Sequence, residues 1–296
     1  MPTLDPSTAS VEAIRARILE LHAQRRRREA KVYAERDRAR TEFPAFCEYV
    51  YRDERNSDRI VLDQLHRTWI THIQRCWDLG LNAAVLAPYG SGKTTHLAVN
   101  VPLFTLGVNP NLRVKLFSTS DDIARERLSL VRRYIEDSHE LREVFPHLRP
   151  STTQDWTKGK LYIQRPTRAK DASLEAKGIL SRATGGRADL IIFDDCNDQR
   201  NTIQQPRDRE KVWDNFLTYM GRLEPGGRVA LIATRYHTKD IPGSILADEV
   251  MRQSWGFLVQ RVTDDFQAID CEYFYGRDEP ASDTEPAVCT LFANAA

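Results

Sequence analysis

Residues 83–95 read Ala-Ala-Val-Leu-Ala-Pro-Tyr-Gly-Ser-Gly-Lys-Thr-Thr, an apolar run followed by a glycine-rich loop. Gly90 and Gly92 let the backbone turn so that successive N–H groups face one anion. Lys93 brings a positive charge to the β- and γ-phosphates of a nucleotide, and the Thr94 hydroxyl can hold Mg²⁺. A helix that begins at Thr94 directs its positive end at the same anion. The stretch predicts a phosphate-binding loop of a nucleotide triphosphatase. Its predicted nucleotide-binding residues are Pro88, Tyr89, Gly90, Ser91, Gly92, Lys93, Thr94 and Thr95.

The loop departs from the usual pattern G-x-x-x-x-G-K-[ST] at its first position, where this chain has Ala87. The alternative interpretation is a turn rich in glycine and serine with an incidental lysine. We favour the phosphate-binding loop because a strand-like run precedes it and a helical pattern follows it.

Beyond the loop, strand-like runs alternate with helical patterns. The sequence predicts strands at 83–87, 114–118, 161–164, 190–193 and 228–234, and helices at 94–106, 121–138 and 206–220. Further helices are predicted upstream, at 9–40, 46–51 and 60–77. This alternation predicts an α/β fold with a mostly parallel sheet that helices cover on both faces.

Two further strand ends carry chemistry. Residues 190–195 read Leu-Ile-Ile-Phe-Asp-Asp, and this pattern places Asp194 beside Mg²⁺ and Asp195 where it can deprotonate an attacking water. The alternative is an Asp-Asp turn that merely ends the strand. Another strand ends at Thr234, a hydroxyl residue that could sense the γ-phosphate. Ligands of parallel sheets sit at the carboxyl ends of the strands, so these residues are expected to meet Lys93 and Thr94.

Composition sets the outer limits. The 296 residues have a net charge of only +1, but 25–40 contain eight basic and three acidic residues, while 264–285 contain eight acids and one arginine. The basic run is either a solvated helix face or a grip on phosphate backbone or an acidic partner. The five cysteines are scattered, which favours reduced thiols, and we expect no membrane span and no secretory signal.

We predict three segments from these patterns. A basic helical extension spans 1–40, a phosphate-loop ATPase domain spans 41–255, and an acidic linker or tail spans 256–296, where the strand and helix patterns fade.

These motifs together resemble those of one family, the large subunits of phage terminases, which drive viral DNA into procapsids. The similarity covers roughly residues 41–250 and depends on the order and spacing of several motifs. They are Phe43-Pro44-x-Phe46-Cys47-Glu48-Tyr49-Val50, the loop with Ala87, Ser118-Thr119-Ser120-Asp121-Asp122-Ile123-Ala124, Gly186-Arg187-Ala188-Asp189-Leu190 before Asp194-Asp195, and Ala233-Thr234-Arg235-Tyr236-His237-Thr238-Lys239-Asp240.

The resemblance implies a P-loop NTPase of the additional-strand (ASCE) type that uses ATP and Mg²⁺. Its catalytic residues would be Lys93, Asp195 and Thr234, with Thr94 and Asp194 at the metal and Gln64 recognising adenine. An arginine that neutralises the transferring phosphoryl group would come from 181–187, where Arg182 is preferred over Arg187.

The same resemblance implies partners and a place of action. The partners would be double-stranded DNA, a portal protein and a small terminase subunit. The chain would act in a homo-oligomeric ring, a pentamer in the family, while the isolated chain could be a monomer. The chain would act in the host cell cytoplasm, at the procapsid portal, and would not be a component of the mature virion.

Two other functions stay open on the sequence alone. One is a helicase-like, DNA-dependent ATPase, and the other is a nucleotide-dependent assembly module with little turnover. Terminase large subunits also carry a nuclease domain after the ATPase. The acids at 264–285 lack the interleaved apolar strands that such a domain needs, so we expect no nuclease activity from this chain.

Overall fold

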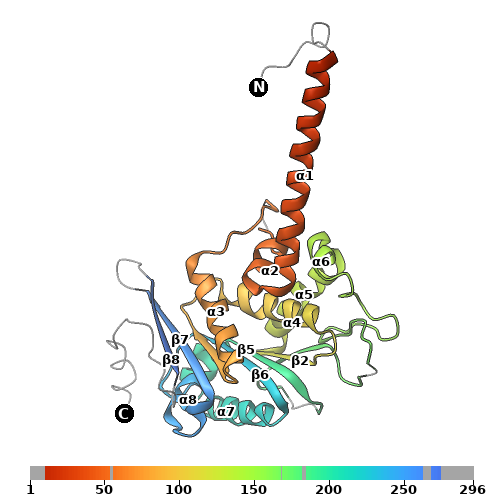
Figure 1. Cartoon of the computed structure of the whole chain (residues 1–296). Helices are drawn as coiled ribbons and strands as arrows, with labels where there is room; N and C mark the ends of the chain where they lie inside the picture. The colour runs from red at the N-terminus through yellow and green to blue at the C-terminus, as the bar shows by residue number, and fades with distance from the viewer. Residues whose placement is uncertain (1–10, 54–55, 168, 182–184, 263–267, 275–296) are drawn as a thin grey trace.

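One eight-stranded sheet organises the fold (Figure 1). The computed structural model describes residues 11–53, 56–167, 169–181, 185–262 and 268–274. The strand order is β3-β4-β2-β5-β6-β1-β7-β8. The bounds are β1 Asn82–Leu86, β2 Val114–Ser118, β3 Lys160–Leu161, β4 Leu174–Gly178, β5 Ala188–Asp194, β6 Leu223–Ala233, β7 Trp255–Val262 and β8 Ala268–Phe274.

The pairing of the strands confirms the predicted fold class. Neighbouring strands from β4 to β7 run parallel, whereas β3 and β8 pair antiparallel at the two edges. Strand β6 lies between β1, which leads into the glycine-rich loop, and β5, which ends at Asp194. This inserted strand is the arrangement expected for a P-loop fold of the additional-strand type.

Helices cover both faces of the sheet. The α-helices are α1 Val11–Thr41, α2 Phe43–Val50, α3 Gln64–Asp78, α4 Asn100–Val108, α5 Asp121–Asp137, α6 His139–Val144, α7 Pro206–Met220 and α8 Ile241–Ala247. Three short helical segments are η1 Thr94–Val99, η2 Arg200–Gln204 and η3 Met251–Ser254. Helices α2 to α6 pack on one face, and α7 and α8 pack on the other.

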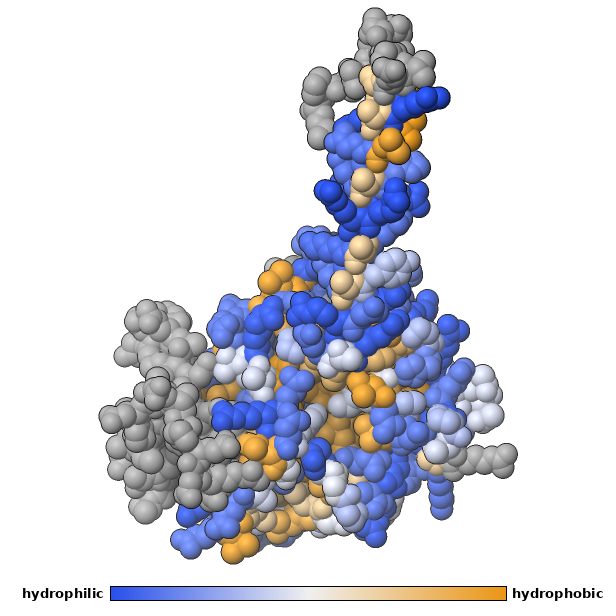
Figure 2. Space-filling view, in the orientation of Figure 1, coloured by the Kyte–Doolittle hydropathy of each residue, from blue (hydrophilic) through white to orange (hydrophobic). Residues whose placement is uncertain are grey.

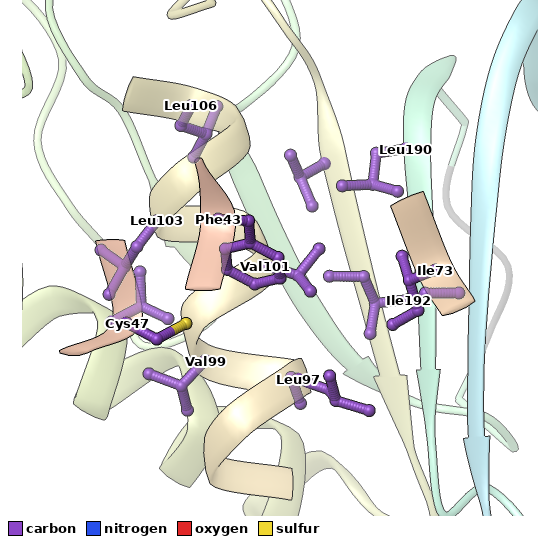
Figure 3. Packing of buried hydrophobic residues seen from close by; sticks show 14 of the residues in the cluster. Phe43, Cys47, Ile73, Leu97, Val99, Val101, Leu103, Leu106, Leu190 and Ile192 are labelled. Carbon is purple, nitrogen blue, oxygen red and sulfur yellow. The ribbon is translucent and has the colours of Figure 1, made fainter. Parts of the chain in front are cut away.

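Strand β5 shows how the sequence builds two cores. Successive side chains of a strand point to opposite faces. Leu190 and Ile192 therefore join the cluster beneath α3 and α4, where Ile73 and Leu97 lie close by (Figure 3). Phe193 points to the other face and packs in a tilted arrangement against Phe216 of α7, with ring centroids 4.8 Å apart. Burial on both faces fixes the register of β5 and hence the position of Asp194 at its end.

The predicted helical N-terminal extension is confirmed as α1, which extends well beyond the body of the molecule (Figure 1). Its base is docked: Ala39 is buried, and the Arg40 guanidinium donates to the carbonyl oxygens of Val144 and Glu143 at 3.0 and 3.2 Å. Further out, its surface is mainly hydrophilic (Figure 2). In the described part of the chain, no helix has the length and apolar character needed to span a bilayer.

Three predicted helices differ from the structure, and the one predicted at 46–51 is α2, which begins at Phe43. The helix predicted at 60–77 begins only at Gln64, because Asp63 has extended backbone angles and acts as its N-cap residue. The helix predicted at 94–106 is divided into the π-helical η1 and the α-helical α4. Pro102 lacks an N–H, so it cannot bond the carbonyl of residue 98, and this accounts for the break in the hydrogen-bond ladder. Wide π turns often occur beside functional sites.

The prediction that a linker starts at residue 256 is wrong. Residues 255–262 form β7, which pairs in parallel with β1 beside the glycine-rich loop. Phe257 and Leu258 are buried against opposite faces of the sheet, so the strand belongs to the core. Strand β8 then pairs with β7. The acids at 275–285 lie outside the described residues.

Candidate active site

The glycine-rich loop follows β1 at the carboxyl edge of the sheet. Gly90 and Gly92 have φ angles of 77° and 83°, in the left-handed region that favours glycine. The Ser91 hydroxyl donates to the Pro88 carbonyl oxygen at 2.8 Å and closes the loop from within. Tyr89 is strongly exposed at its tip, and Thr95 is half-buried in η1. The two left-handed glycines turn the backbone as in the anion-binding concavities that successive N–H groups can form.

Lys93 is the central charge of the site. Its side chain is buried, and its Nζ atom lies 3.0 Å from Asp195 Oδ2 and donates to Thr234 Oγ1 at 2.8 Å. The same atom lies 3.5 Å from the Pro88 carbonyl oxygen. The structure thus brings Lys93 together with two residues that follow it by more than a hundred positions in the sequence.

Asp194 is fully buried between two donors. Its Oδ1 atom accepts from Thr94 Oγ1 at 3.2 Å, and its Oδ2 atom accepts from Arg127 Nε at 3.3 Å. Burial and the neighbouring carboxylate of Asp195 raise the pKa of Asp194 to about 6, while Arg127 and Thr94 act in the opposite direction. Arg127 was not predicted, because nothing in the sequence distinguishes it from the other arginines of α5.

Asp195 is held in an unusual backbone conformation with a φ of 44°. Its N–H donates to the Ile232 carbonyl oxygen at 2.8 Å, and its Oδ1 atom accepts from the Thr234 N–H at 2.8 Å. A left-handed φ is costly for a residue with a side chain, so the surrounding contacts must enforce it. The strain turns the second carboxylate toward Lys93 and Thr234 and away from the line of the strand.

The donor set at Thr94 and Asp194 suits Mg²⁺. One hydroxyl and one carboxylate oxygen lie 3.2 Å apart, and oxygen ligands of this kind are what Mg²⁺ prefers when phosphate and water supply the rest. Among the described residues, no group of three His, Cys, Asp or Glu side chains could hold a metal by itself. The geometry therefore fits an ion that is shared with a nucleotide better than a metal held by protein alone.

Gln64 is the first residue of α3 and is exposed. The turn that it opens lies against the loop, because the Nε2 atom of His66 is 3.2 Å from the Ser91 carbonyl oxygen. The His66 ring stacks on His96, with centroids 4.0 Å apart. Burial and the His66 ring lower the pKa of His96 to about 4, so this imidazole is neutral beneath the loop at neutral pH. The adenine-recognising role of Gln64 stays a prediction.

The structure describes only one of the two arginines that are candidates for neutralising the transferring phosphoryl group. Arg182 lies outside the described residues. Ser181, just before it, is fixed at the carboxyl edge, where its hydroxyl donates to Asp121 Oδ1 at 2.6 Å. Arg187 is exposed and precedes the first residue of β5, whereas Asp194 is the last, so the strand separates them by about 20 Å. Arg187 therefore cannot join Asp194 in the site of its own chain.

The segment after Thr234 is organised by the buried carboxylate of Asp240. Its Oδ2 atom accepts from Arg235 Nε at 3.0 Å and from the Tyr236 N–H at 3.0 Å, while Oδ1 caps α8 by accepting from the Gly243 N–H at 2.9 Å. His237 takes part in the same turn, since its Nδ1 atom accepts from the Lys239 N–H at 2.9 Å. Thr234 is thus joined to α8 through a fixed polar turn.

Asp240→Ala should lower the free energy of unfolding by about 3 kcal/mol, because it leaves a guanidinium and several backbone N–H groups without their acceptor. Asp240→Asn keeps the cap acceptor and should cost less. Urea denaturation measures both changes. Glu249→Ala is the control, since Glu249 is 84% exposed and its ion pair with Arg252 is 4.0 Å long. Equal midpoints for the Asp240 and Glu249 variants would contradict this account of the turn.

Comparison with known proteins gives partial matches. The large subunit of the terminase of Enterobacteria phage T3 is 28% identical over 123 residues, which are 42% of this chain and 20% of the phage T3 protein. The crystal structure of the HK97 bacteriophage large terminase aligns with a TM-score of 0.53 and 17% identity, over 77% of this chain and 45% of that one. A structure of Saccharomyces cerevisiae Dbp5 bound to Nup159, Gle1, IP6 and ADP aligns with a TM-score of only 0.37 and 14% identity.

No protein-family model matches the chain. The aligned regions span less than half of the length of either terminase protein. The likeness to the HK97 protein is one of fold, since the identity is only 17%. The sequence and the fold of this chain are therefore similar to those of bacteriophage terminase large subunits.

Proposed function

We propose that this chain hydrolyses ATP and is the motor part of a machine that moves double-stranded DNA into a viral procapsid. One observation carries the proposal: Lys93, Thr94, Asp194, Asp195 and Thr234 meet at the carboxyl edge of a sheet of the additional-strand type. The similarity to terminase large subunits supports DNA as the substrate that is moved. A portal protein, a small terminase subunit and further copies of the chain in a ring are the partners that we propose, in the host cytoplasm.

The contacts suggest how the residues would divide the work. A bound polyphosphate would compete with Asp195 for the Lys93 ammonium, because the two lie only 3.0 Å apart. Asp195 would then be free to accept a proton from the attacking water. When bound, Mg²⁺ would offset the negative charge of the phosphates, with Thr94 and Asp194 holding it. Arg182, from a neighbouring copy, is proposed to neutralise the transferring phosphoryl group.

Thr234 is proposed to pass the change to the rest of the molecule. Its hydroxyl contacts Lys93 and its N–H contacts Asp195, so both contacts depend on what Lys93 binds. The next residue, Arg235, is paired with Asp240 at the start of α8. Movement at Thr234 would therefore reach the start of α8 through the neighbouring residue Arg235 and its ion pair with Asp240.

The test is phosphate release from ATP by the full chain, with and without linear double-stranded DNA. We expect hydrolysis to require Mg²⁺ and its rate to rise when DNA is added. If copies of the chain assemble, the rate should rise more steeply than in proportion to protein concentration. A forked duplex in the same reactions should keep its strands paired. Separation of the fork would favour a helicase-like ATPase, and absence of both nucleotide binding and hydrolysis would refute the proposal.

A further inference from the structure

The two oxygens of the Asp194 carboxylate have different partners. Oδ1 accepts from the Thr94 hydroxyl at 3.2 Å, on the side of the loop. Oδ2 accepts from the Arg127 Nε atom at 3.3 Å, on the side of α5. Thr94 is the residue assigned to Mg²⁺, so only Oδ1 lies beside the proposed metal, and Oδ2 is occupied by a fixed cation.

A carboxylate in this position needs a second contact. The last torsion of an aspartate side chain is soft, so one hydrogen bond does not fix the plane of the carboxylate or the direction in which an oxygen faces the loop. Asp194 is also fully buried, and a buried carboxylate is costly unless a charge and hydrogen bonds compensate it. Arg127 supplies the only ion pair of Asp194 among the described residues, with a rigid planar donor.

Helix α5 is placed to hold Arg127 steadily. Ser120 caps the helix by accepting from the Ile123 N–H, and Asp121 accepts from the Gly178 N–H at 2.8 Å and the Ser181 hydroxyl at 2.6 Å. The beginning of α5 is therefore tied to the carboxyl edge of β4. Arg127 follows less than two turns later, with its side chain 21% exposed and aimed inward at Asp194.

We propose that Arg127 is the positioning residue of the metal site: it holds Oδ2 of Asp194 so that Oδ1 faces Thr94. The inference deepens the proposed function and rests on it, since it assigns a residue of α5 to the same site. Arg127 also contacts Glu126 at 3.3 Å, but Glu126 is 68% exposed, so that pair contributes little. A purely structural Arg127 would affect stability without affecting how nucleotide binding depends on Mg²⁺.

The test measures the binding of a fluorescent ADP analogue to the full chain over a series of Mg²⁺ concentrations, with EDTA as the starting point. Removing the partner that orients a metal ligand usually weakens metal binding by about 10- to 100-fold. Arg127→Ala should therefore raise, by about 10- to 100-fold, the Mg²⁺ concentration at which the enhancement of ADP-analogue binding is half-maximal. Arg127→Lys, which keeps the charge but loses the planar donor, should restore part of the loss.

Arg133→Ala is the matched control, because Arg133 lies on the same helix, is exposed and has no ion pair among the described residues. It should leave the Mg²⁺ dependence unchanged. Thermal unfolding of each variant separates lost positioning from lost folding, and Arg127→Lys keeps the test valid if the alanine variant unfolds. Wild-type Mg²⁺ dependence in a folded Arg127→Ala variant, or in Arg127→Lys where the alanine variant does not fold, would overturn the inference alone. Wild-type protein that binds no ADP would instead overturn the proposed function.

Discussion

Lys93→Ala should reduce ATP hydrolysis by at least about 10²- to 10³-fold, the usual cost of removing one preorganised donor that stabilises the charge developing in a transition state. It should also weaken nucleotide binding. Lys93 is buried, and its ammonium lies between the loop carbonyl of Pro88, Asp195 and Thr234, so its removal leaves these three groups without their shared cation. Phosphate release and equilibrium binding of a fluorescent nucleotide measure the two losses separately.

Lys239→Ala is the control for Lys93→Ala. Lys239 is an exposed lysine in the turn after Thr234 and has no ion pair among the described residues, so its loss removes one positive charge near the site without touching the loop. Its hydrolysis rate should stay within about twofold of the wild type. A Lys93→Ala protein that still hydrolyses ATP at a rate close to wild type would show that the loop is not the phosphate site.

Much of the fold was predictable because it depends on local patterns. The apolar runs of β1 and β5 are continuous, as expected for strands that are buried on both faces, and β2 is buried along its whole length although it contains Lys115. Helix α7 was predicted with the bounds that it has, 206–220, because Pro206 suits its first turn and Gly221 follows its last residue. These signals lie within a few residues of the element that they define.

The elements that were missed depend on distant partners. Strand β4 reads Leu-Glu-Ala-Lys-Gly, which is typical of a helix, yet Glu175 is buried beside Lys115 of β2 with an N–O distance of 2.6 Å. That ion pair exists only once β2 and β4 lie side by side, so no local pattern announces it. Strand β7 carries a local signal, the apolar run Phe257-Leu258-Val259, but the acidic composition that begins at Asp264 favours a linker at this place in the chain.

The candidate site shows the same division. The sequence placed Lys93, Asp194, Asp195 and Thr234 at strand ends, and their meeting followed from the rule for parallel sheets. Arg127 and Asp240 could not be chosen in this way. Arg127 owes its role to its contact with Asp194, which lies far away in the sequence, and Asp240 owes its role to the folded turn that brings Arg235, the Tyr236 N–H and the Gly243 N–H to its carboxylate.

Asp195→Asn should separate binding from hydrolysis. The amide keeps the shape of the side chain and an oxygen that can accept from the Thr234 N–H, but it cannot accept a proton from water and carries no charge for Lys93. Loss of a general base typically costs about 10²- to 10⁴-fold in rate. Nucleotide binding should be kept or strengthened, since the phosphates would no longer compete with a carboxylate 3.0 Å from Lys93.

Single-turnover hydrolysis and nucleotide binding, measured on the same Asp195→Asn sample, report the lost rate and the retained affinity. Asp122→Asn is the charge-matched control, because the Asp122 side chain is 94% exposed. The opposite responses of Lys93→Ala and Asp195→Asn in the binding assay make the argument specific: one variant removes the cation that the phosphates need, and the other removes the anion that holds it. If Asp195→Asn hydrolysed ATP at the wild-type rate, the base would have to be another group. If it lost binding together with Lys93→Ala, the ion pair would support the shape of the loop and would not compete with phosphate.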